Sequence, residues 1–169
     1  MKLLLYGTFF LNLAMLGVMW AVLPNEIATK FNLDGTPTGG MKTEENVILM
    51  GCVLSFILAL QGGTHYLLGI CPPYGFNVPY EKYWKTEENF PKLRAITQKW
   101  MQEFWCGLFL MFFFVNGGIL LANLRKPPHA GWELGIIIGL FLLFTIVWTA
   151  RLYWILRPPH AEGNSATHQ

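Results

Sequence analysis

Charged residues are scarce in this chain of 169 residues. They make up 13% of the sequence, whereas a soluble domain usually carries about 25%. Hydrophobic residues reach 53% and the mean hydropathy is +0.38, which leaves too few polar side chains to cover a soluble surface. This composition argues against a soluble enzyme and against a disordered chain.

Several motifs of catalysis and metal binding are also missing. The sequence contains no G-x-S-x-G, P-loop or H-E-x-x-H pattern, and its three cysteines form no C-x-x-C pair. Their odd number also argues against a disulfide framework. The twelve Lys and Arg residues are scattered between apolar blocks, so they build no basic face for nucleic acid. We therefore expect no enzyme, no metal site and no nucleic-acid partner.

Four long apolar blocks dominate the chain. A helix of about 20 residues crosses the hydrocarbon core and satisfies its own backbone groups there. We therefore predict an all-α integral membrane protein with a single domain at residues 1–157. Its four spans are expected at about 3–23, 47–70, 104–124 and 133–156, followed by a flexible cytoplasmic tail at 158–169. The first block could instead be a signal peptide, but its length and the lack of an A-x-A site favour a retained helix.

The distribution of Lys and Arg predicts the orientation. The N-terminus, the second loop and the C-terminal part carry Lys2, Lys82, Lys85, Lys92, Arg94, Lys99, Arg151 and Arg157. The other side carries Lys30, Lys42, Arg125 and Lys126. Because cytoplasmic loops carry the excess of positive charge, both termini are predicted to lie in the cytoplasm.

The end of the second loop has helical periodicity. After Pro91, which suits a first helical position, Leu93, Ile96, Trp100 and Phe104 recur at steps of three to four residues. We predict a cytoplasmic amphipathic helix that lies in the interface before the third span, where its cations can meet anionic lipid head groups. A partner-binding helix remains the alternative.

Small residues recur at four-residue spacing on three of the predicted spans. Such stripes let helices approach closely, either within one bundle or against another subunit. They comprise Ser55, Ala59 and Gly63 on the second span, Gly118 and Ala122 on the third, and Gly135 and Gly139 on the fourth. Docking of another subunit is expected above all at Gly135 and Gly139.

Four polar residues form a possible intramembrane site: His65, Gln61, Glu103 and Arg151. His65 shares a helix face with Gln61 and can make structural hydrogen bonds, contact a quinone or lipid head group, or bind heme or another metal. Glu103 opens the third span and Arg151 closes the fourth. These two can pair, or Arg151 can extend to the interface alone.

The loop between the first two spans is the most informative soluble segment. It has about 22 residues, whereas helix connections in bundles usually have 2–8. Asp34-Gly35 and the stretch 37–40 have the composition of turns. Four apolar residues can anchor the loop on the bundle: Ile27, Phe31, Leu33 and Met41. We predict an ordered recognition cap that leaves Glu26 and Lys30 available to a partner, although a purely structural cover of the helix ends is the alternative.

The residues assigned to this recognition loop are Lys30, Phe31, Asn32, Asp34, Gly35 and Pro37. Asn32, Asp34 and Gly35 together resemble part of a calcium loop. The match fails because Lys30 and Met41 stand where acidic ligands are required.

The same loop resembles a bacterial membrane domain of unknown function, DUF1648, which also occurs in the immunity protein against a sporulation-delaying toxin. The matching residues are Leu23, Pro24, Ile27, Phe31, Asn32, Gly35, Pro37 and Gly39. Ala28, Lys30 and Gly40 depart from the pattern. Lys30 replaces a histidine, so no metal- or proton-sensing role is carried over to it. A second segment, Asn77–Trp84, is similar to the one that follows the second span in that family.

The resemblance implies a small integral protein of the bacterial cytoplasmic (inner) membrane, and it implies no reaction. We expect a non-enzymatic accessory, sensing or immunity-type protein. It would bind another membrane protein through the outer loop and the small-residue helix faces, surrounded by membrane lipids. The alternative is a subunit of a redox or transport complex that binds quinone or heme near His65.

Overall fold

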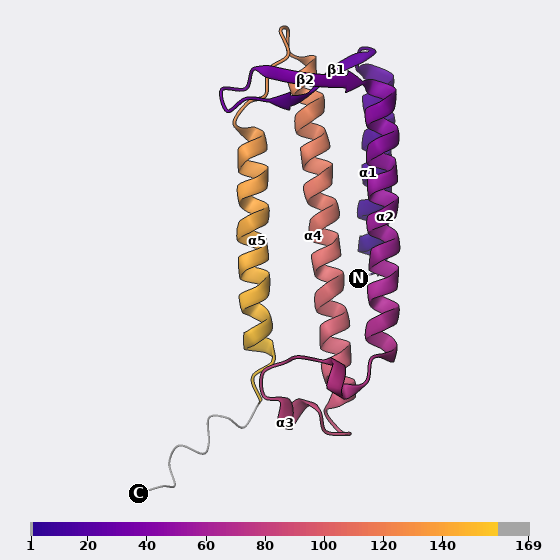
Figure 1. The fold of residues 1–169 in the computed structure, drawn as a ribbon, viewed down its shortest axis with the longest axis vertical. Helices are drawn as coiled ribbons and strands as arrows, with labels where there is room; N and C mark the ends of the chain where they lie inside the picture. The colour runs from indigo at the N-terminus through magenta and orange to yellow at the C-terminus, as the bar shows by residue number, and fades with distance from the viewer. Residues whose placement is uncertain (1, 159–169) are drawn as a thin grey trace, which may run out of the picture.

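The computed structural model describes residues 2–158, so the predicted tail at 158–169 lies almost entirely outside the described residues. Long helices lie side by side, and a β-hairpin crosses one end of them, which we call the hairpin end (Figure 1). The elements are α1 (Lys2–Val22), β1 (Glu26–Phe31), β2 (Pro37–Lys42), α2 (Thr43–Ile70), η1 (Pro73–Gly75), α3 (Glu81–Trp84), α4 (Phe90–Leu124) and α5 (Glu133–Ile155).

Helices α1, α2, α4 and α5 are each long and apolar enough to cross a membrane. The predicted multi-pass helical membrane protein is therefore confirmed at this level, and each predicted span overlaps one of these helices. Which end of the bundle faces the cytoplasm stays a prediction. We call the end away from the hairpin the opposite end.

The buried core lies between α1, α2 and α4. Helix α1 turns one stripe inward, with Leu5, Leu16 and Met19 buried against residues such as Leu54 of α2 and Phe109 of α4. Helix α5 contributes no buried residue within its length and packs mainly against α4. The membrane part is thus a three-helix core with a fourth helix attached to one side.

The predicted small-residue stripes lie in two different environments, because one faces the bundle and two face away from it. On α4, a Cβ atom at Gly118 would lie 2.5 Å from Leu134 of α5, and Ala122 is buried, so this stripe serves packing within the chain. The stripes of α2 and α5 face away from the bundle. Ser55 and Ala59 are exposed, and no atom lies within 4 Å of a Cβ built at Gly63, Gly135 or Gly139.

The outer loop contains the hairpin, which the all-α prediction did not include. Strand β1 pairs with β2 in antiparallel register, with Ile27 opposite Met41 and Ala28 opposite Gly40. The prediction of turns at residues 37–40 was wrong, because this stretch forms most of β2. A side chain at Gly40 would overlap the carbonyl of Ile27, so glycine serves close strand approach here rather than a turn.

The helix predicted before the third span is part of a longer helix in the structure. Residues 90–103 are helical, but they form the first part of α4, which continues without a break to Leu124. Leu93 and Phe90 are buried in a second apolar cluster beneath the bundle, so part of the apolar side of this segment contacts protein. Its position at the membrane interface stays a prediction.

Gly35 is the position where the backbone demands glycine most clearly. Its φ is +84°, and a Cβ atom there would overlap the carbonyl oxygen of Ala130 in the α4–α5 loop. Gly35→Ala should therefore destabilise the protein by more than about 1 kcal/mol. Gly135→Ala, in open space on α5, should leave stability unchanged or slightly raised. Thermal unfolding of both variants in detergent measures this, and equal stabilities would contradict the packing of Gly35.

Candidate functional site

The β-hairpin is attached to the bundle by one asparagine of α4. The side chain of Asn123 accepts a hydrogen bond from the backbone N–H of Ala28 at 2.8 Å and donates one to the Ala28 carbonyl at 2.9 Å. It also donates to the carbonyl of Ile119 within its own helix at 2.9 Å. The amide thus satisfies both backbone groups of Ala28 on the side of β1 that faces away from β2.

The tip of the hairpin is organised by local hydrogen bonds. The Asp34 carboxylate accepts from the backbone N–H of Thr36 at 3.0 Å and from its hydroxyl at 2.7 Å. These bonds, with the hydroxyl contributing most, lower the pKa of Asp34 below its usual value. The Asn32 side chain donates to the Thr36 hydroxyl at 3.2 Å, and the backbone N–H of Gly35 donates to the Asn32 carbonyl at 2.9 Å.

Two further contacts hold the hairpin against the rest of the chain. The backbone N–H of Ala130 donates to the carbonyl of Gly35 at 2.9 Å, which joins the tip to the α4–α5 loop. At the other end of the hairpin, Thr43 donates its hydroxyl to the carbonyl of Pro24 and its backbone N–H to the carbonyl of Asn25, the latter at 2.9 Å. The hairpin is therefore fixed at its base, along β1 and at its tip.

The apolar residues predicted to anchor this loop differ in how deeply they are buried. Ile27 is buried beneath the hairpin, whereas Phe31 and Met41 are half-buried. Leu33 is fully exposed, so its prediction as an anchor was wrong. It lies in the tight turn at the tip, which directs its side chain away from the bundle.

A shallow, open depression of about 570 Å³ lies on the hairpin. Its lining includes Pro37 of the predicted recognition loop and three charged residues: Glu26, Lys42 and Glu45. Lys30 is exposed beside it, with its stem next to Gly39. Within residues 2–158, none of these four charged side chains takes part in an ion pair. A rigid, charged and accessible surface therefore crosses the hairpin end.

The four residues of the predicted intramembrane polar site fall into two separate places. Arg151 of α5 donates from Nη1 to the Glu103 carboxylate of α4 at 2.7 Å. His65 and Gln61 lie on α2, and across the described part of the chain no hydrogen bond or ion pair joins them to the first pair. The His65 Nδ1 atom is buried without a hydrogen-bond partner among the described residues.

Next to the ion pair, two tryptophans join the same helices. The rings of Trp100 and Trp148 stack with centroids 3.4 Å apart and an angle of 7° between their planes. Each indole N–H donates to the other residue's backbone carbonyl at 3.1 Å. The α4–α5 pair is thus held at this level by a charged contact and by a reciprocal aromatic one.

The segment Asn77–Trp84, singled out by the sequence resemblance, folds under the opposite end. The indole N–H of Trp84 donates to the carbonyl of Leu156 at 2.7 Å, at the end of α5. Trp84 and Leu156 are buried together with Phe76, Phe90 and Leu93 in what we call the opposite-end cluster. This segment therefore fixes the end of α5 to the start of α4.

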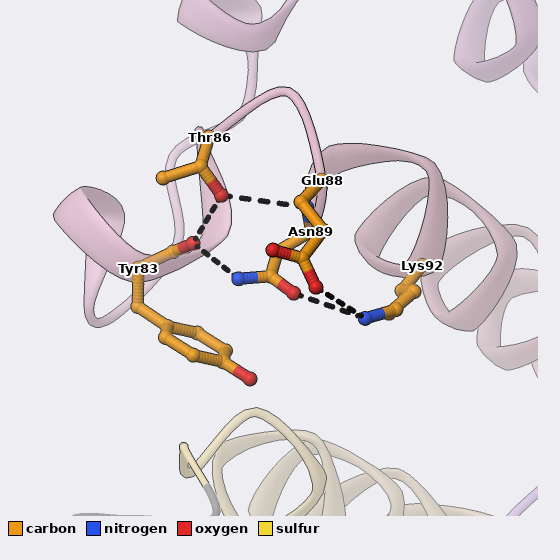
Figure 2. A network of polar contacts seen from close by, with 5 residues as sticks. All are labelled: Tyr83, Thr86, Glu88, Asn89 and Lys92. Carbon is orange, nitrogen blue, oxygen red and sulfur yellow. Dashed lines mark hydrogen bonds and ion pairs between the residues drawn. The ribbon is translucent and has the colours of Figure 1, made fainter.

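The turn that leads into α4 is closed by polar side chains (Figure 2). Thr86 donates its hydroxyl to the carbonyl of Tyr83 at 3.1 Å, and the Asn89 amide donates to the same carbonyl at 3.2 Å. The ammonium group of Lys92 lies 3.2 Å from the Asn89 amide oxygen and 3.7 Å from the Glu88 carboxylate. These surface contacts shape the turn, and their contribution to stability is small because they are exposed.

Three buried asparagines are further features that the sequence analysis missed. Asn12 of α1 donates to the carbonyl of Phe109 of α4 at 2.9 Å, between two spans. Asn116 of α4 and Asn46 of α2 are also fully buried. In the sequence, each of these residues is an asparagine within or at the edge of an apolar block. Asn123 is another asparagine of this kind. Because an amide in hydrocarbon needs a partner, such residues indicate protein-facing positions.

Within residues 2–158, no three side chains of His, Cys, Asp or Glu gather closely enough to hold a metal ion. The arrangement offers instead a fixed polar surface at the hairpin end and a charged pair between two helices near the opposite end. In comparisons with known proteins, no protein-family model, curated protein or solved structure matches this chain.

Asn123→Ala should release the hairpin without unfolding the bundle. The variant leaves both backbone groups of Ala28 without their partners, which costs about 1–3 kcal/mol. We expect faster amide hydrogen exchange at Ala28 while the α1 core residues keep their protection. Leu124→Ala, at the neighbouring exposed position, is the matched control. Unchanged exchange at Ala28 would show that the Asn123 amide does not hold the hairpin.

Proposed function

We propose that this chain is a non-enzymatic accessory, sensing or immunity-type membrane protein that binds another membrane protein through its hairpin. The observation that carries the proposal is the fixed hairpin with an exposed charged surface. The Asn123 contacts hold β1 in place, yet Glu26, Lys30 and Lys42 stay accessible. A surface ordered before binding loses less conformational entropy when a partner docks.

The resemblance to DUF1648 proteins supports a location in the bacterial cytoplasmic membrane. In the orientation proposed from the positive-inside rule, the opposite end faces the cytoplasm and the hairpin faces outward. The partner would then meet the hairpin from outside or beside the membrane. The open small-residue faces of α2 and α5, at Gly63 and Gly135, are compatible with contact to a second membrane protein within the bilayer.

Reversal of charge on the hairpin tests this proposal. Lys30→Glu and Lys42→Glu should each reduce co-purification of the partner from native membranes at least fivefold, because they place an acid on the binding surface. Folding should be unchanged, since neither lysine is in an ion pair within the described residues.

Lys126→Glu is the matched control, because it makes the same charge change at the same end but on the α4–α5 loop. If both hairpin variants retain every partner that the unmodified protein captures, the recognition role is wrong and the hairpin only covers the helix ends.

The second candidate is a cofactor-binding subunit of a redox or transport complex. The observation that favours it is the buried Nδ1 atom of His65, which has no hydrogen-bond partner within residues 2–158. The only other histidine there, His129, lies beside Gly35 at the hairpin end. Heme at His65 would give a Soret band in the purified protein that His65→Ala abolishes. If the protein purified from native membranes shows no such band, the alternative of heme binding at His65 is wrong.

A further inference from the structure

Three neighbouring cavities lie in a row along α4 and α5. The first, of about 310 Å³, lies deepest among the apolar residues and is lined on α4 by Leu110 and Phe114 and on α5 by Leu140 and Phe144. The second, of about 350 Å³, shares Leu140 and Phe144 with it and reaches the ion pair of the two helices. Because the two cavities share these lining residues, they adjoin one another between the same two helices, and we call the row of cavities the α4–α5 groove.

The third cavity, of about 140 Å³, extends the groove to the opposite end. It shares Glu103 and Arg151 with the second cavity and adds Lys99 and Trp100 to the lining. The groove therefore has an apolar part inside the spans and a charged mouth. The charged residues at this mouth are Glu103, Lys99 and Arg151, so the mouth carries a net positive charge.

The length of the apolar part matches one leaflet of a membrane. Glu103 and Phe114 are eleven positions apart on α4. At about 1.5 Å per residue, the groove between them runs roughly 16 Å. Half of a hydrocarbon core of about 30 Å is roughly 15 Å. A lipid chain that starts at the charged mouth would thus end near the bilayer midplane.

The size of the groove argues against a helix as its occupant. A helix with side chains is about 10–12 Å across and needs a broad face. The three cavities measure only about 350, 310 and 140 Å³ and lie between two helices that already touch. Gly107 keeps this contact close, because a Cβ atom there would lie 2.5 Å from the Phe144 ring. An acyl chain is narrow enough for such a groove.

We propose that the α4–α5 groove binds one anionic phospholipid of the leaflet at the opposite end. One of its two acyl chains lies along Leu110, Leu140 and Phe144, and its phosphate is bound by Lys99 and Arg151. Glu103 holds one Arg151 nitrogen at 2.7 Å and leaves the other donors of the half-exposed guanidinium for the phosphate. This site is distinct from the hairpin and does not depend on the proposed partner binding.

The charged mouth is tested with phosphatidylglycerol and phosphatidylcholine of identical acyl chains. Native mass spectrometry of the full-length protein in mild detergent should show one phosphatidylglycerol retained at least fivefold more than phosphatidylcholine. Lys99→Gln should reduce this retention about fivefold, the effect of one interfacial cation. Lys82→Gln, an equal charge change on α3 at the same end, should not. Equal retention of the two lipids, or equal effects of the two variants, would overturn the proposal.

The apolar part is tested by filling it. Leu140→Trp should reduce phosphatidylglycerol retention, because Leu140 lines both apolar cavities. Leu142→Trp places the same side chain two positions away, where it lines none of the three cavities. Circular dichroism verifies that both variants keep their helix content. If a folded Leu140→Trp variant retains lipid as well as the Leu142→Trp variant does, the acyl chain does not occupy the groove.

Discussion

Packing against α4 is the interaction on which every other part of the structure depends. This helix contacts α1, α2 and α5, and it also reaches β1. The hydrophobic effect does not drive helices together within a bilayer, because lipid chains are as apolar as the side chains. Close packing and interhelical hydrogen bonds must therefore hold the spans together. Phe109 of α4 lies in the core cluster between α1, α2 and α4 and has no exposed surface. Because α4 runs from the opposite-end cluster to the hairpin, it joins both ends of the molecule.

Polar contacts attach neighbouring elements to α4 at three levels along its length. Near the opposite end, Glu103 pairs with Arg151 and holds α5. At mid-span, the carbonyl of Phe109 accepts from Asn12 and so joins α1. At the hairpin end, Asn123 binds the backbone of β1. These three polar contacts thus attach three different elements to the same helix.

The sequence predicted the four spans well, because long apolar blocks follow directly from the thickness of the membrane. It did not predict the hairpin, since Gly39 and Gly40 have turn composition and only their pairing with β1 makes them a strand. It predicted the helix at residues 90–103, but periodicity could not show that Phe90 and Leu93 would be buried in the opposite-end cluster. The role of Asn123 depends on a contact 95 positions away, which no local pattern contains.

The attachment of α5 shows how these constraints leave room for a ligand. Trp84 and the pair of Trp100 and Trp148 fix the helix near the opposite end, and an Arg125–Glu133 ion pair fixes it at the hairpin end. Between these contacts Phe144 of α5 lies close to Gly107 of α4, but α5 buries no residue, so its apolar side chains touch α4 only in part. Because the close contacts are separated along α5, the side chains between them do not fill the whole interface with α4. The groove therefore follows from how α5 is attached to α4, and the phospholipid proposed above would fill it.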